Sequence, residues 1–318
     1  MRQAGVDLIH EVAFVGPIAA GRPFVVTVHD LSFLFYPQGF RALNRTYLRI
    51  FTRLSVRRAR RVIAVSESTK RDLVQNYRLS PGKVDVVPNG VDTSFRPLPA
   101  ARVAAFRVER GLPESFILFV GTLEPRKNVT RLIEAYARLP GAKPPLLLVG
   151  GKGWLYDDLF ARSEELDLTD QVRFMGYVPA EDLPLWYNAA ELFVYPSLYE
   201  GFGLPPLEAM ACGTPVITSA TSSLPEVVGT AGLLVDPTDV EALATVMQRV
   251  LSDKDLQSEM QRAGLEQARA FSWRRTAQQT VGSYRRALQQ RSAMTASKLA
   301  TEDAPGRVSA PEGGDGRV

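Results

Sequence analysis

The sequence holds very little cysteine and histidine. Cys212 is the single cysteine among 318 residues, so no disulfide can form within the chain, and a reducing compartment is the simpler expectation. No cysteine or histidine cluster has the spacing of metal ligands, and the one Asp-x-Asp pair, Asp253 and Asp255, lies in a polar stretch at a predicted helix end. We therefore expect neither a disulfide framework nor a bound metal ion.

The sequence also lacks a long apolar run. No run approaches the roughly 18 residues of a membrane span, and Met1 to Asp7 show no basic stretch that leads into an apolar one. This favours a cytoplasmic protein, either free or peripheral at the inner face of the membrane. With 45% hydrophobic residues and 318 residues in all, the chain can bury a substantial core and is predicted to form two domains.

Positive charge is concentrated in one segment. Arginine recurs every fourth residue at Arg41, Arg45, Arg49, Arg53 and Arg57, and Arg58, Arg60 and Arg61 follow. On a helix the first five form one stripe. A solvated helix face fits this pattern, and so does a contact with anionic lipid headgroups or a lipid-phosphate acceptor. Nucleic acid fits least, so no nucleic-acid partner is expected.

Short β-branched runs alternate with longer amphipathic stretches, which is typical of parallel strands joined by helices. The predicted fold class is therefore α/β, with two Rossmann-like doubly wound domains. Four strands are predicted in the first part, at residues 6–10, 24–28, 61–65 and 84–87, with helices at 42–58 and 67–77. Six strands follow, at residues 116–120, 146–149, 172–175, 192–195, 215–218 and 232–235, with helices at 128–139, 183–190, 205–211, 240–252 and 272–290.

The predicted domain organisation has a partial first domain and a complete second one. The boundaries are residues 1–92 for the first domain, 93–111 for a linker, 112–271 for the second domain, 272–290 for a helix that packs back toward the first, and 291–318 for a disordered tail. A doubly wound domain normally has about six strands. The four strands of the first part therefore predict that it lacks its beginning, which would leave an open sheet edge and weaken its activity.

The loop after the strand at 116–120 carries two cations. Arg126 and Lys127 precede Asn128, which is predicted to be the N-cap of the next helix. Cations at the positive end of a helix dipole are unfavourable by themselves, so they suggest an anionic partner such as a diphosphate. Two solvated loop cations are the alternative.

The loop after the strand at 192–195 carries two carboxylates on either side of a glycine-rich turn. Glu200 lies in the loop and Glu208 on the helix that follows, with Gly201 and Gly203 between them. These glycines can adopt backbone angles closed to other residues and let the backbone approach a ligand. The carboxylates could accept hydrogen bonds from the hydroxyls of a sugar and a ribose. A solvated loop glutamate and a helix-start carboxylate are the alternatives.

The segment from Glu200 to Glu208, followed by Ala209-Met210-Ala211-Cys212-Gly213-Thr214-Pro215-Val216-Ile217, resembles the signature of family 4 retaining glycosyltransferases, which have the GT-B fold. Further segments resemble that family in order and spacing; they are Gly121 to Asn128, Gly150-Gly151, Phe174 to Tyr177, Ser223 to Glu226 and Pro88 to Asp92. The resemblance covers residues from about 6 to 290. It implies a hexosyltransferase that uses a nucleoside-diphosphate sugar and a glycan or lipid-linked acceptor, as in polysaccharide biosynthesis.

The resemblance also implies roles for particular residues. It assigns Glu200 to the donor sugar, Glu208 to the ribose, Arg126 and Lys127 to the diphosphate, the backbone near Tyr177 to the base, and the amides of Phe202, Gly203 and Leu204 to the phosphates, with Gly121 and Thr122 in the donor site. Many members have arginine directly after the glycine, where this sequence has Thr122. Arg126 would then carry more of the charge, a pattern similar to a mannosyltransferase-like subgroup, and GDP-mannose is the first expectation for the donor.

His29 follows a predicted strand of the first part and is expected to face the cleft between the domains, near the transferred sugar. A loop-capping histidine is the alternative. No enzyme nucleophile is evident, and the resemblance implies front-side attack with retention. Two other functions stay open, namely a sugar-nucleotide epimerase of the same fold and a donor-binding remnant without transfer.

Overall fold

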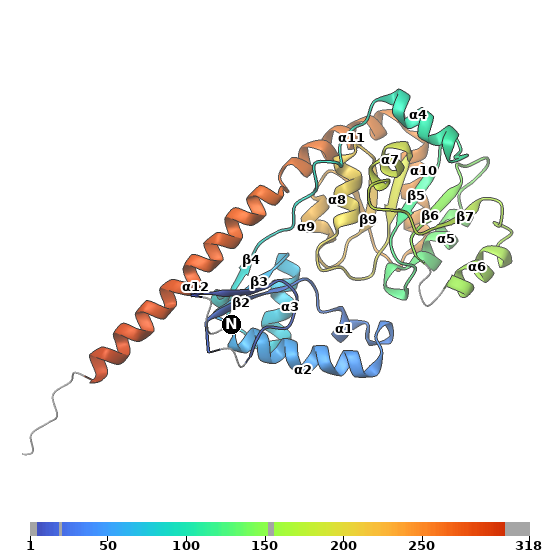
Figure 1. Cartoon of the computed structure of the whole chain (residues 1–318). Coiled ribbons are helices and arrows are strands. Elements are labelled where there is room, and N and C mark those ends of the chain that lie inside the picture. The colour runs from blue at the N-terminus through green and yellow to red at the C-terminus, as the bar shows by residue number, and fades with distance from the viewer. Residues whose placement is uncertain (1–4, 19–20, 152–155, 303–318) are drawn as a thin grey trace, which may run out of the picture.

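The first part of the chain forms a small parallel sheet. The computed structural model describes residues 5–18, 21–151 and 156–302. β1 (Ile9–Glu11), β2 (Phe24–Val28), β3 (Arg61–Ala64) and β4 (Val84–Val86) lie in that order, each parallel to its neighbour. Four strands were predicted here and four are found among the described residues. Short α1 (Ser32–Phe35), long α2 (Ala42–Arg58) and α3 (Glu67–Tyr77) complete this domain (Figure 1).

The second part forms a six-stranded parallel sheet. Its strands are β5 (Ile117–Val120), β6 (Leu146–Val149), β7 (Val172–Gly176), β8 (Leu192–Tyr195), β9 (Val216–Ser219) and β10 (Leu233–Val235), in the order β10-β9-β8-β5-β6-β7. Each lies within one residue of its predicted position. β5 and β8 are neighbours at the centre, where the strand order reverses. The carboxyl ends of strands at such a switch point form the ligand crevice of doubly wound sheets.

Helices cover both faces of this second sheet, so its four inner strands, β5, β6, β8 and β9, are buried at every residue, while the edge strands β7 and β10 are only partly buried. They are α5 (Val129–Ala137), α6 (Tyr156–Glu165), α7 (Leu183–Ala189), α8 (Leu204–Ala211), α9 (Leu224–Val228), α10 (Val240–Ser252) and α11 (Lys254–Arg269). α9 is shorter than the window in which helical periodicity shows, and α11 is largely polar. α6, α9 and α11 were not predicted from the sequence.

The connection between the domains is shorter than the predicted linker, residues 93–111, because α4 (Ala100–Glu109) lies within that range. Val103 and Phe106 of α4 are buried in the core of the second domain, and the Phe106 ring packs edge-on against Trp186 at 5.7 Å. The prolines that precede α4 are typical of a linker, although the apolar residues of α4 lie on one side of the helix. The interdomain connection therefore ends before residue 100.

α12 (Trp273–Glu302) returns to the first domain and leaves it as one long helix (Figure 1). Tyr284 and Ala287 pack against β2 and β3, and the Arg286 Nη2 atom lies 3.0 Å from the Asp85 Oδ1 atom. The helix was predicted to end at residue 290, with disorder from 291. It continues to Glu302, because residues 291–302 contain no glycine or proline and several strong helix formers. Residues 303–318 lie outside the described part. None of the described helices is both long and apolar enough to cross a bilayer.

Candidate functional site

The site is built where β5 and β8 end side by side at the switch point. β5 leads into the short 3₁₀ turn Pro125–Lys127 and then α5, while β8 leads into the loop 196–203 and then α8. The two loops are joined directly, since the Leu198 amide and the Ser197 hydroxyl both donate to the Arg126 carbonyl, at 2.8 and 3.1 Å. The parallel fold thus brings together two motifs that are about 70 residues apart in the chain.

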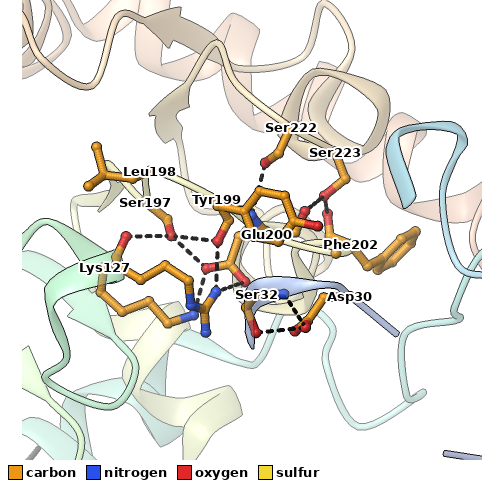
Figure 2. Close-up of polar contacts among 12 residues, drawn as sticks. Asp30, Ser32, Lys127, Ser197, Leu198, Tyr199, Glu200, Phe202, Ser222 and Ser223 are labelled. Carbon is orange, nitrogen blue, oxygen red and sulfur yellow. Dashed lines mark hydrogen bonds and ion pairs between the residues drawn. The ribbon is translucent and has the colours of Figure 1, made fainter. Parts of the chain in front are cut away.

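A buried carboxylate with two cations lies at the centre of these loops (Figure 2). The Lys127 Nζ atom is 2.6 Å from the Glu200 Oε1 atom, and the Arg126 Nη1 atom is 2.8 Å from Oε2. The hydroxyls of Ser197 and Tyr195 donate to Oε1 at 2.7 and 2.9 Å. Lys127 is 8% exposed and Glu200 9%, so the alternatives of solvated loop cations and a solvated loop glutamate are wrong.

These contacts fix the charge of Glu200. Burial alone would raise its pKa, but the positive charges of Lys127 and Arg126 and the hydrogen bonds from Lys127 and Ser197 outweigh burial and lower the pKa to about 2. Burial disfavours the charged form of Arg126 as well, and Glu200 and Glu124 reverse this, so its pKa is raised. Glu200 and Arg126 are therefore charged at neutral pH, and Glu200 is the carboxylate that Arg126 and Lys127 share.

The charge of Glu200 should make the protein sensitive to acid. Its pKa in the folded state lies below the ordinary 4.5, so its stabilising contribution is complete above that pH and is lost as the pH falls toward about 2. That contribution is on the order of 3 kcal/mol. Urea unfolding of the wild type should show a steep fall in the free energy of unfolding over this range, and Glu200→Gln should flatten it. Glu266→Gln, at an exposed position, serves as the control. An equally steep fall in Glu200→Gln would contradict this assignment.

Asn128 does not cap α5 as predicted. Its backbone is left-handed, with φ of 59°, and its side chain makes no capping hydrogen bond. The Asn128 amide instead donates to the carbonyls of Pro196 and Pro237, at 3.1 and 2.7 Å. The side-chain oxygen, which would accept the capping hydrogen bond, instead accepts from the Arg131 Nη1 atom at 2.9 Å. Asn128 thereby links the loop that carries Arg126 and Lys127 to the loops at Pro196 and Pro237.

The two glycines of the second loop are required for different reasons. Gly203, at the start of α8, has φ of +113°, as the sequence led us to expect. Gly201 has no such angle; a Cβ atom there would lie 1.7 Å from the His29 carbonyl oxygen. Gly201 is therefore needed for the close approach of the first domain, and the prediction of a special backbone angle was wrong for it.

Hydrogen bonds hold this loop against the first domain. The Gly201 carbonyl accepts from the hydroxyls of Ser66 and Thr69, at 2.7 and 3.1 Å. The Tyr199 hydroxyl donates to the Asp72 Oδ2 atom at 2.8 Å and accepts from the Leu31 amide at 3.2 Å. The loop that carries Glu200 is thereby fixed from both domains.

Glu226 makes a second interdomain contact. Its carboxylate, on α9, accepts hydrogen bonds from the amides of Glu67 and Ser68 at the start of α3, both at 2.7 Å. A carboxylate suits the positive end of a helix dipole. Together with the hydrogen bond between Tyr199 and Asp72, this contact clamps α3 onto loops of the second domain.

Glu226→Ala should loosen the two domains, because two charge-assisted hydrogen bonds are lost together with the ion pair to Arg71. We expect a loss of about 1.5 to 3 kcal/mol in the free energy of unfolding and a larger radius of gyration by X-ray scattering. Glu241→Ala removes an exposed carboxylate whose ion pair with Arg138 is 3.7 Å long, and it should have little effect. Similar effects of the two variants would contradict a clamp.

The remaining predicted residues lie around this centre. His29 follows β2; its carbonyl faces Gly201, while its exposed ring places Nε2 2.8 Å from the Val12 carbonyl oxygen. Glu208 is half-buried on α8 and accepts from the Tyr187 hydroxyl at 3.0 Å. Burial raises its pKa, opposed by that hydrogen bond. Tyr177 is 78% exposed at the end of β7.

The loop after β5, which begins at Gly121, crosses closely over the loop after β6, which begins at Gly150. The Gly121 amide donates to the Val149 carbonyl at 2.9 Å, and a Cβ atom on Gly150 would lie 1.9 Å from the Gly121 carbonyl oxygen. Thr122 comes directly after Gly121, at the point where the two loops cross. Beside the loop, a cavity of about 330 Å³ opens between the start of α5 and Leu159, with Leu198 in its wall.

Sequence reasoning missed several residues of the site. Tyr195 and Ser197 bind Glu200 directly, and the Ser222 hydroxyl accepts from the Glu200 amide at 2.9 Å (Figure 2). Their places at a strand end and in loops were the available signals. Asp72 gave no such signal, because its role depends on a contact with the other domain.

Two protein-family models match this chain, one in each domain. Residues 104–267 match the sequence model described as Glycosyl transferases group 1, and residues 1–95 match that described as Glycosyltransferase Family 4. The first match includes both loops of the site.

Similar proteins carry related names. The chain is 36% identical over 265 residues to O-antigen chain mannosyltransferase B of Escherichia coli, covering 82% of this chain and 70% of that protein. It is 34% identical to Serotype-specific mannosyltransferase WbdA of Escherichia coli, over 76% of this chain and 32% of that protein. It is 37% identical to D-inositol 3-phosphate glycosyltransferase of Mycolicibacterium smegmatis, over 72% of this chain and 54% of that protein. The chain thus spans between 32% and 70% of the length of these relatives.

Solved structures resemble it along most of its length. Sucrose-phosphate synthase of Thermosynechococcus elongatus superposes with a TM-score of 0.77 at 30% identity, covering 91% of this chain and 75% of that one. HepE of Anabaena, in complex with UDP and glucose, superposes with a TM-score of 0.75 at 25% identity, covering 87% and 77%. The predicted α/β class with two Rossmann-like domains is confirmed.

Proposed function

This chain belongs to the group 1 glycosyl transferases, a family of enzymes, and on that basis we propose that it moves a hexose from a nucleoside-diphosphate sugar to a glycan or lipid-linked acceptor. The observation that carries the proposal is the buried cluster of Arg126, Lys127 and Glu200 at the switch point of the second sheet. One buried cation, Lys127, and one half-buried cation, Arg126, beside loop amides are suited to a diphosphate.

In this proposal Glu200 occupies the place of the diphosphate until the donor arrives. A donor diphosphate carries more negative charge than one carboxylate, so it would draw Arg126 and Lys127 away from Glu200. Glu200 would then be free to accept hydrogen bonds from the sugar hydroxyls. Ser197 and Tyr195 would keep its carboxylate in place during this exchange.

Charge stabilisation is the chemistry that the cluster can supply. Breaking the bond between the sugar and the diphosphate leaves negative charge on the leaving group, and fixed cations in a water-poor site stabilise that charge. Arg126 and Lys127 provide this positive charge, so we propose that no metal ion takes part. His29, across the domain boundary at Gly201, would face the sugar and the acceptor.

The other donor contacts follow from the same placement. Glu208 would accept from the ribose, the backbone at Tyr177 would meet the base, and Gly121 and Thr122 would border the phosphates. The amides of Phe202, Gly203 and Leu204, at the start of α8, would assist with the phosphates. Thr122 in place of an arginine leaves Arg126 as the main cation.

Mannose is proposed as the sugar and GDP as the carrier. Two relatives named as mannosyltransferases support the sugar, and the Thr122 position supports the same subgroup. Nucleotide-sugars should be screened by thermal unfolding, because a ligand that binds only the folded state stabilises it by about 2.7 kcal/mol at roughly 100 times its Kd. GDP-mannose should give the largest rise in Tm. A larger rise with UDP-glucose would overturn the donor, and no rise with any nucleotide-sugar would overturn the function.

A further inference from the structure

The cavity beside the start of α5 has no part in the donor site. It lies between α5 and α6, which stand side by side on one face of the second sheet (Figure 1). Its volume is about 330 Å³. Pockets that bind small molecules have volumes of roughly 300 to 1,000 Å³, so there is room for about one or two sugar rings. None of the residues assigned to the donor, all within the described part of the chain, lines this cavity.

The second sheet separates the cavity from the proposed ribose site. Glu208 lies on α8, which packs against α7, α9 and α11, whereas α5 packs against α6 and α10. The strands β5 to β7 run toward one edge of the sheet and β8 to β10 toward the other. Right-handed crossovers then place α5 and α8 on opposite faces. A donor bound at Glu208 therefore leaves the cavity free.

The cavity lies close to the boundary between the domains. A smaller cavity of about 40 Å³ lies between Ser32 and Tyr36 of the first domain and Arg126 of the second. Glu124 and Pro125 line both cavities, so the two cavities lie on either side of this turn. A chain molecule whose end lies beside Arg126, where the diphosphate is proposed to bind, could thus extend past Glu124 into the larger cavity.

The wall of the larger cavity does not suit an anion. Two of its residues are acidic and one is basic, namely Glu124, Glu134 and Arg131. The Glu134 Oε1 atom lies 2.9 Å from the Arg162 Nη2 atom, and the Glu124 Oε1 atom lies 2.6 Å from the Arg126 Nη2 atom. Because these pairs leave no excess of positive charge, a phosphate or a nucleotide would gain little here.

The same wall suits a neutral ligand with many hydroxyls. Carboxylate oxygens accept hydrogen bonds from hydroxyls, and the Arg131 guanidinium donates them. The Thr130 hydroxyl, which can do both, has no hydrogen-bond partner among the residues that the structure describes. Leu159 and Leu198 form an apolar part of the wall, against which the C–H face of a sugar ring can pack.

We propose that this cavity is a subsite for the acceptor and that the acceptor is an oligosaccharide. Its end sugar would lie between the domains beside Arg126, and the next sugar would bind in the cavity between α5 and α6. This inference rests on the proposed function, and it selects a glycan chain over a lipid that carries a single sugar.

Saccharide binding to the full chain in the presence of GDP tests the proposal. The probes are mono-, di- and trisaccharides of mannose, glucose, galactose and N-acetylglucosamine. Saturation-transfer NMR identifies those that bind, and calorimetry measures their affinities. At least one disaccharide should bind about tenfold or more tightly than its monosaccharide, because the second ring adds several hydrogen bonds.

Two variants should remove this gain in affinity. Thr130→Trp fills the cavity with a large side chain, and Glu134→Ala removes a carboxylate from its wall. In both variants the disaccharide should bind no better than the monosaccharide, because the second ring has lost its site. Affinities for the monosaccharide and for GDP should stay within about twofold of the wild type. Thermal unfolding shows whether each variant is folded.

Matched controls lie elsewhere on the second domain. Thr169→Trp makes the same change at an exposed position, and Glu165→Ala removes the other carboxylate that pairs with Arg162. Neither of these described residues lines the cavity, so both variants should keep the gain in affinity for the disaccharide.

Three results would overturn the proposal. The first is that no disaccharide binds better than its monosaccharide. The second is an equal loss in the cavity variants and their controls. The third is that Thr130→Trp and Glu134→Ala weaken GDP binding, which would place the donor in this cavity. Sugar transfer by the wild type together with the first or second result would leave the proposed function standing, whereas a failure to bind any nucleotide-sugar would refute that function itself.

Discussion

Replacing Arg126 and Lys127 together with alanine should remove measurable binding of a nucleoside diphosphate. Each cation would contribute about 1.5 to 3 kcal/mol as a charge-assisted hydrogen bond to the phosphates, so the pair accounts for about a hundredfold or more in affinity. Calorimetry with the free nucleoside diphosphate measures this directly. Because the ligand lacks a sugar, the result does not depend on Glu200 contacting one.

The double variant needs a matched partner, because it leaves the Glu200 carboxylate buried without its two cations. An unpaired buried charge is destabilising by itself. The triple variant Arg126→Ala, Lys127→Ala, Glu200→Gln removes that charge, and it should regain stability without regaining nucleotide binding. Unchanged affinity in either variant, while folded, would rule out the assignment of the diphosphate to these cations.

Glu200→Gln should nearly abolish sugar transfer while sparing nucleotide binding. The rate of transfer should fall by about a hundredfold or more, since the loss of one fixed polar group that stabilises the transition state commonly lowers kcat by that factor. Affinity for the free nucleoside diphosphate should stay the same or rise, because the carboxylate that competes for Arg126 and Lys127 is gone. This separation of two readouts distinguishes a sugar contact from general damage to the site.

Glu208→Gln provides the comparison for this prediction. Glu208 is assigned to the ribose, which is present in both the donor and the free nucleoside diphosphate, so transfer and nucleotide binding should weaken together, by about tenfold. If Glu200→Gln weakened nucleotide binding as much as Glu208→Gln does, the two roles would be refuted.

Much of the fold was predictable from local pattern. The ten strands were predicted because buried parallel strands are short apolar runs with turn residues at their ends, and the runs at 24–28, 146–149 and 192–195 match their strands residue for residue. Helices with strong periodicity, such as α3 and α10, were also found at their predicted positions. Short α1 and α9 were missed, because four or five residues carry too little periodicity to be read.

The sequence by itself determined which residues are chemically suited to a sugar-nucleotide site: the cations before α5 and the two carboxylates about the glycine-rich turn. Because these residues follow strands of one parallel sheet, whose carboxyl ends lie at the same edge, the sequence also predicts that they lie near one another. Only the tertiary structure decided how they pair. Ion pairs between Glu200 and both cations depend on distances set by packing, as does the need for a glycine at 201, where the His29 carbonyl from the other domain leaves no room for a side chain. Contacts of this kind join residues remote in the chain, and local sequence rules act only over a few neighbouring residues, so no local pattern could have revealed them.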